Sequence, residues 1–156
     1  MTLIACLVLT GCGTDGGNPE PTAAPATSIP TATPAAALAG VGEIVWTASV
    51  VPETQAPVDE MAALPNDAPQ VIAALPVEKL PAGTVLQAHW SIDGRPLPAL
   101  DPEPVTVEEG LAGAWVTWTL QWAGNQPWPI GRLGIAVEIN GGDGPTAEIP
   151  IVRPNA

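Results

Sequence analysis

Residues 114–122 have the sequence AWVTWTLQW, in which two sets of side chains alternate along the chain. Successive side chains of an extended strand point to opposite faces of a sheet, so this alternation predicts a strand with one buried face. The apolar face would hold Val116, Trp118, Leu120 and Trp122. The opposite face would hold Trp115, Thr117, Thr119 and Gln121.

The same period of two recurs on both sides of this stretch. Residues 83–94, GTVLQAHWSIDG, alternate in the same way and end in an Asp-Gly pair that is typical of a hairpin turn. Residues 132–140, RLGIAVEIN, also alternate and run into a turn at Asn140-Gly141-Gly142. Shorter segments rich in β-branched or apolar residues predict four further strands, at residues 43–50, 70–75, 105–109 and 147–152.

These segments amount to about seven strands over roughly 110 residues, with turn residues every 8 to 12 positions, which predicts an all-β fold, an antiparallel β-sandwich. Only residues 58–64, VDEMAAL, could form a short helix or turn. Residues 128–142, WPIGRLGIAVEINGG, resemble the last hairpin of immunoglobulin-like domains in bacterial lipoproteins. That resemblance implies a sandwich of the immunoglobulin-like or fibronectin-III-like kind. The cysteine pair of immunoglobulin domains is missing from this sequence.

Charge and composition narrow the classes of partner. The chain has 156 residues and a formal net charge of −12. Its four scattered basic residues are Lys79, Arg95, Arg132 and Arg153. Because phosphate-backbone binding needs clustered Lys and Arg, we expect no nucleic-acid partner. The 46% of hydrophobic residues and six Trp are enough for one core, despite 20 Pro and 16 Gly.

The start of the chain has the features of a targeting signal. Residues 3–9, LIACLVL, are too short to span a bilayer but have the size of a signal-peptide apolar region. The following Leu9-Thr10-Gly11-Cys12 resembles the lipobox of bacterial lipoproteins. The resemblance implies that Cys12 carries a diacylglycerol and becomes the first residue after cleavage. Signal peptides usually begin with Lys or Arg, and Met1-Thr2 has neither, so we expect the natural start of the protein to lie upstream. The alternative to a lipoprotein signal is that residues 3–9 form a buried strand and that Cys12 is an ordinary thiol.

A Pro-rich segment separates this signal from the strands. Residues 13–40 consist almost entirely of Gly, Pro, Ala, Thr and Ser, which bury too little apolar surface to offset the entropy of ordering. We therefore predict a disordered tether. The resulting organisation is a signal peptide at 1–11, the lipidated Cys12 and linker at 12–41, and the sandwich at 42–154. No cysteine follows Cys12, so the sandwich has no disulfide.

The sequence offers no recognisable catalytic motif. It contains no P-loop, G-x-S-x-G or H-E-x-x-H pattern. The single histidine, His89, lies on the polar face of its strand, as expected of a surface residue. Four acids lie close together in sequence, namely Asp101, Glu103, Glu108 and Glu109. Hydrolysis by paired carboxylates, however, needs a deep cleft that a small domain rarely provides. We expect no enzymatic activity, no cofactor and no metal site.

Binding is the role that remains, and two kinds of site stay open. An exposed Trp at position 115 or 128 could stack on a sugar ring or on a partner side chain. Oxygen ligands from Asp93, Asp101 and Glu103 could bind Ca²⁺, although Asp93 is equally suited to a turn.

The sequence therefore predicts a lipid-anchored, non-catalytic interaction or structural module on the extracytoplasmic face of a bacterial cell membrane. An envelope protein or a cell-wall polysaccharide would be its partner, and the membrane would be reached through the lipid on Cys12. The alternatives are a carbohydrate-binding module that uses an exposed Trp, and a Ca²⁺-dependent binding domain.

Overall fold

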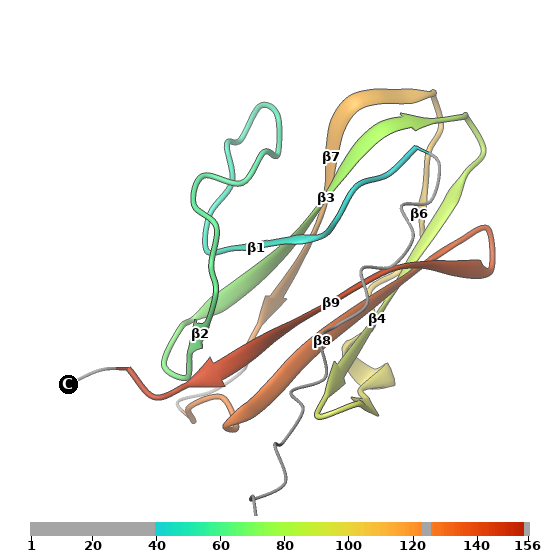
Figure 1. Ribbon diagram of the computed structural model, residues 1–156. Coiled ribbons are helices and arrows are strands. Elements are labelled where there is room, and N and C mark those ends of the chain that lie inside the picture. The colour runs from blue at the N-terminus through green and yellow to red at the C-terminus, as the bar shows by residue number, and fades with distance from the viewer. Residues whose placement is uncertain (1–39, 123–125, 155–156) are drawn as a thin grey trace, which may run out of the picture. The chain divides into compact units, whose positions relative to one another are not determined.

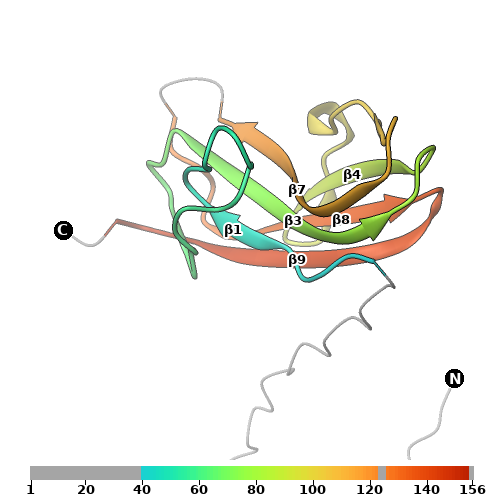
Figure 2. The same cartoon turned by 90° about the horizontal axis from the view of Figure 1, so that it is seen from above.

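The computed structural model describes residues 40–122 and 126–154, which form two β-sheets packed face to face (Figures 1 and 2). The predicted all-β sandwich is therefore confirmed. Its elements are β1 (Val45–Thr47), β2 (Leu64–Pro65), β3 (Gln70–Leu80), β4 (Val85–Ile92), β5 (Arg95–Pro96), η1 (Pro98–Leu100, a 3₁₀ turn), β6 (Val105–Thr106), β7 (Leu111–Gln121), β8 (Gly131–Ile139) and β9 (Gly142–Val152). Each of the seven predicted strands overlaps an observed one, and the two-residue strands β2 and β5 are additional.

The order of the strands is that of an immunoglobulin-like sandwich. One sheet has the order β1-β3-β7, and the other has the order β2-β9-β8-β4-β5, with β6 also pairing with β4. The first sheet thus corresponds to strands A, B and E, and β4, β8 and β9 correspond to strands C, F and G. All named strand pairs are antiparallel except β2 with β9, which is parallel. Within the described residues, no strand stands beside β7 in the place of strand D.

The apolar faces of the strands meet between the two sheets, as the alternation predicts. Trp118 and Leu120 of β7 are only 4% and 6% exposed. The inward residues of β4 and β8 are also buried: Leu86, Ala88, Trp90, Leu133, Ile135 and Val137. Trp46 and Trp90 bring the two sheets into aromatic contact, with ring centroids 6.1 Å apart and ring planes at 45°.

Two tight turns close the hairpins of the six-stranded sheet. Asp93 and Gly94 have φ angles of 49° and 72°, and Asn140 and Gly141 have φ angles of 53° and 74°. Two successive positive φ angles are the mark of the type I′ turn, which favours Asn-Gly and Asp-Gly, so both turn predictions are confirmed. Residues 58–64 contain bends and the first residue of β2, with no helical turn.

The first described residues already belong to the sandwich. Val41 is 3% exposed and forms a bridge with Val77 of β3. The Gly40 carbonyl accepts hydrogen bonds from the backbone N–H groups of Glu78 and Lys79, at 2.9 and 3.0 Å. The sandwich thus includes two residues that the sequence analysis assigns to the linker. No helix in the described part of the chain is long and apolar enough to cross a membrane.

Candidate functional site

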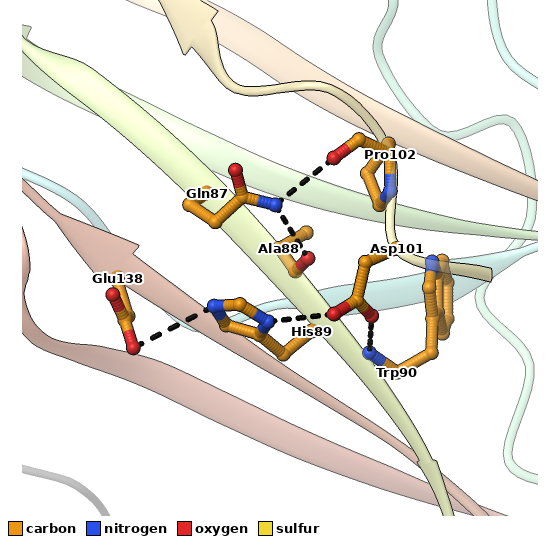
Figure 3. Close-up of polar contacts among 7 residues, drawn as sticks. All are labelled: Gln87, Ala88, His89, Trp90, Asp101, Pro102 and Glu138. Carbon is orange, nitrogen blue, oxygen red and sulfur yellow. Dashed lines mark hydrogen bonds and ion pairs between the residues drawn. The ribbon is translucent and has the colours of Figure 1, made fainter. Parts of the chain in front are cut away.

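The single histidine lies between two carboxylates on the outward face of the six-stranded sheet (Figure 3). His89 Nδ1 is 2.8 Å from Asp101 Oδ2, and His89 Nε2 is 3.5 Å from Glu138 Oε1. The other oxygen of Asp101 accepts a hydrogen bond from the backbone N–H of Trp90 at 2.8 Å. The cluster therefore joins β4 to β8 on one side and to the segment after η1 on the other.

This cluster replaces a missing strand along β4. Between the residues of β4 that pair with β5 and those that pair with β6, the strand has an open edge. There the Asp101 carboxylate accepts a hydrogen bond from the Trp90 N–H, and the Leu97 N–H donates to the Trp90 carbonyl at 2.8 Å. The Gln87 side chain donates to the Pro102 carbonyl at 2.9 Å. These bonds fix residues 97–102 against β4, which is a structural role.

The His89–Asp101 pair resembles two of the three groups of a catalytic triad. An Asp–His pair activates a nucleophile when the second ring nitrogen faces a hydroxyl or thiol. In this protein, that nitrogen faces Glu138 instead. From the sequence alone, His89 is expected to be a lone surface residue. The signal that points to its contact with Asp101 is the Asp-Gly turn at 93–94, which sends the following residues back along β4.

The three acids proposed as Ca²⁺ ligands are not brought together. Asp93 Oδ1 accepts the backbone N–H of Arg132 at 2.9 Å, whereas Asp101 is engaged by His89 and Trp90. Glu103 is exposed. Across residues 40–122 and 126–154, no group of three or more His, Cys, Asp or Glu side chains is arranged to hold a metal ion. The geometry therefore gives the Ca²⁺ alternative no support.

The two Trp residues predicted as open platforms have different surroundings. Trp115 lies on the outer face of β7 opposite Pro76, and it is partly buried. Trp128 is only 1% exposed, and its indole N–H donates to the Ala68 carbonyl at 2.6 Å. The prediction that Trp128 offers an open ring is wrong, because its ring fills the core and its one polar group is already bonded.

A hollow next to Trp128 is lined by another Trp, Trp122. Trp122 stacks on Trp128 with ring centroids 4.9 Å apart and ring planes at 29°, and it is partly buried. The hollow has a volume of about 440 Å³ and is lined by Asn66, Asp67, Ala68, Pro69, Trp122, Gln126 and Pro127. The alternation assigns Trp122 to the apolar face, but β7 ends at Gln121, so the Trp122 ring lies just past the end of the sheet.

The sheet edges provide another candidate surface. Strand β1 has three residues, and β2, β5 and β6 have two residues each. In contrast, β7 has eleven residues and pairs only with β3. Apart from that pairing, residues 111–121 form no backbone hydrogen bond with any other described residue.

Cys12, the predicted lipidation site, lies outside the described residues. In comparisons with known proteins, no family model matches the sequence, and a search of curated proteins finds no significant match.

Proposed function

We propose that this protein is a non-catalytic interaction module, anchored by a lipid on Cys12 at the extracytoplasmic face of a bacterial cell membrane. It would bind an extended segment of an envelope protein, which would add a strand to the open edge of β7. The single observation that carries this proposal is the long, uncharged and unpaired edge of β7 in the described part of the chain.

The composition of β7 differs from that of the other long edge. Beyond its short pairing with β2, residues 142–150 of β9 are open to one side. That stretch contains two acids and two prolines: Asp143, Pro145, Glu148 and Pro150. Charges and prolines are the usual protection of an edge strand against pairing with another chain. Strand β7 contains neither a charged residue nor a proline.

An unprotected edge offers backbone N–H and C=O groups to an incoming strand. About half of these groups in an edge strand point away from its one neighbour and can bond to an added peptide. The outer face of β7 adds Thr117 and Thr119, whereas Trp118 on the inner face is buried in the core. A partner segment with alternating apolar and polar side chains would match both faces.

Charge favours a different protein over a second copy as the partner. Each copy carries a formal charge of −12, so two copies repel one another as they approach. An uncharged or basic partner segment meets no such repulsion. The lipid anchor supports an envelope partner, because the lipobox-like Leu9-Thr10-Gly11-Cys12 and the Pro-rich linker would hold the sandwich close to the membrane surface.

The test compares two Thr→Lys variants of the full chain as baits for envelope proteins. Thr119→Lys places a charge on the β7 edge, and Thr146→Lys places the same charge on an exposed position of β9. We expect recovery of the partner to fall about tenfold or more with Thr119→Lys, and to stay at the wild-type level with Thr146→Lys. Both substitutions are at exposed positions, so each should change stability by no more than about 0.5 kcal/mol.

A direct readout identifies the contact. When the captured partner binds, the backbone amides of residues 117–121 should gain protection from hydrogen exchange. Equal recovery with both variants, or protection that avoids β7, would show that the edge is not the binding surface.

A further inference from the structure

We propose that the hollow beside Trp122 is a shallow binding site for a neutral sugar ring of an envelope polysaccharide. The ring of Trp122 would form its floor, and the side chains of Asn66, Asp67 and Gln126 would bond to the sugar hydroxyls. The site lies just past the end of β7, and its aromatic ring is that of Trp122, whereas the sequence singles out Trp115 and Trp128.

The Trp122 ring is held in place before any ligand arrives. It stacks on Trp128 at a centroid distance of 4.9 Å, and Trp128 is 1% exposed. Trp128 is itself bonded at two points, by its indole N–H to the Ala68 carbonyl at 2.6 Å and by its backbone N–H to the Asn66 carbonyl at 2.7 Å. A ring that is already ordered loses little conformational freedom on binding, which favours a weak ligand such as a sugar.

The same contacts fix the polar rim of the hollow. The Asn66 backbone is bonded on both sides, because its N–H donates to the Val152 carbonyl at 2.7 Å and its carbonyl accepts from Trp128. Among the hydrogen bonds between described residues, none uses the side chains of Asn66, Asp67 or Gln126. Two amides and a carboxylate supply both donors and acceptors, as the hydroxyls of a sugar require.

The lining of the hollow selects the class of ligand. Its volume of about 440 Å³ lies at the lower end of the range of about 300–1,000 Å³ for ligand pockets, which suits one or two sugar rings. Among the described residues of the lining, Ala68, Pro69, Pro127 and Trp122 are apolar and Asn66, Asp67 and Gln126 are polar, so the hollow offers both an apolar surface and hydrogen-bonding groups, as a sugar ring requires. Among the described residues that line the hollow, Asp67 alone is charged, and it would repel an anionic sugar.

A Pro-rich peptide is the competing occupant, since such segments dock against aromatic side chains. Grooves of that kind are lined by several aromatic rings. Here, of the lining residues that the structure describes, Trp122 is the single aromatic one. Amide and carboxylate groups outnumber it, and they fit hydroxyls better than the donor-free ring of proline. We therefore favour the sugar and treat peptide binding as an outcome of the test.

The experiment titrates the full chain with neutral trisaccharides of glucose, of mannose and of N-acetylglucosamine, each up to about 10 mM, which detects affinities in the millimolar range. A peptide with the sequence of residues 19–34, PEPTAAPATSIPTATP, serves as the Pro-rich probe. The readout is the NMR signal of the Trp122 indole N–H, assigned with a Trp122→Phe variant. We expect at least one trisaccharide to shift this signal and the peptide to leave it unchanged.

Variants separate a binding role from a structural one. Trp122→Ala should weaken the sugar affinity at least about tenfold, which corresponds to about 1.4 kcal/mol. Because Trp122 also packs on Trp128, the exposed Gln126→Ala and Asp67→Asn test the same site without touching the core, and both should weaken binding at an unchanged melting temperature. Trp115→Ala is the matched control on the outer face of β7, and it should bind as the wild type does.

Three results would overturn the proposal: no trisaccharide binds, the peptide alone shifts the Trp122 signal, or the three hollow variants bind sugar as the wild type does. The Thr119→Lys variant keeps this test independent of the β7 interaction. It should retain the sugar affinity even where capture of a protein partner is lost, so either proposal can fail while the other stands.

Discussion

A pair of Trp→Phe variants tests how polar groups are satisfied in the core. The indole N–H of Trp118 is buried with no hydrogen-bond partner among the described residues, whereas that of Trp128 donates to the Ala68 carbonyl at 2.6 Å. Replacing either indole by a phenyl ring removes apolar contact worth about 1–2 kcal/mol, the equivalent of one or two methylene groups. The polar contribution then has opposite signs at the two positions.

At Trp118 the substitution also removes a buried, unbonded donor, which relieves about 1–3 kcal/mol. At Trp128 it removes a hydrogen bond worth about 0.5–1.5 kcal/mol. We therefore expect Trp118→Phe to leave the free energy of unfolding nearly unchanged and Trp128→Phe to lower it by about 2–3 kcal/mol.

Urea unfolding of both variants and the wild type, followed by circular dichroism, measures this difference of about 2–3 kcal/mol directly, provided that the m-value stays constant. Equal losses at the two positions would refute the reasoning. They would mean that the Trp118 N–H has a partner, for example an ordered water molecule.

Three further variants test the inner face of β7, the lipid anchor and the contact of Asp101 with β4. Trp118→Ala, at a site only 4% exposed, should lower the free energy of unfolding by about 3–5 kcal/mol, so a melting temperature within a few degrees of wild type would contradict the assigned inner face. Cys12→Ser should move the protein from the membrane fraction to a soluble or uncleaved form, and a wild type that is exported yet soluble would contradict lipid anchoring. Asp101→Ala should leave the Trp90 N–H without its acceptor, lower stability by about 1–3 kcal/mol and speed hydrogen exchange at that amide; the exposed control Glu103→Ala should change stability by no more than about 0.5 kcal/mol.

The strands and their faces could be predicted from the sequence because alternation is a local property. Trp118 and Trp90 are buried as their positions in the pattern require. The turn at Asn140-Gly141 could be predicted for the same reason, since a type I′ turn depends on two adjacent residues. Strand β1 is shorter than the predicted strand at 43–50, because the β-branched content of a segment does not determine how far a neighbouring strand accompanies it.

The side-chain clusters could not be predicted, because they depend on residues that are distant in sequence. His89 meets Asp101 across a hairpin and Glu138 across a strand pair. Trp128 was predicted as an open ring, but the carbonyl that bonds its indole belongs to Ala68, 60 residues earlier. No local pattern contains that information, so the sequence could give the type of residue available for a site and not its neighbours.

A local sequence pattern also does not determine the place of a strand in its sheet, and β7 is an example. Periodicity alone does not tell a central strand from an edge strand. A long strand without charges or prolines suits the interior of a sheet, where neighbours cover both sides. Strand β7 has this interior composition, yet only β3 pairs with it in the described part of the chain. Strand β9 has the protected composition that an open edge requires. The mismatch at β7 disappears if a partner supplies the missing strand, which is the state that the Thr119→Lys experiment tests.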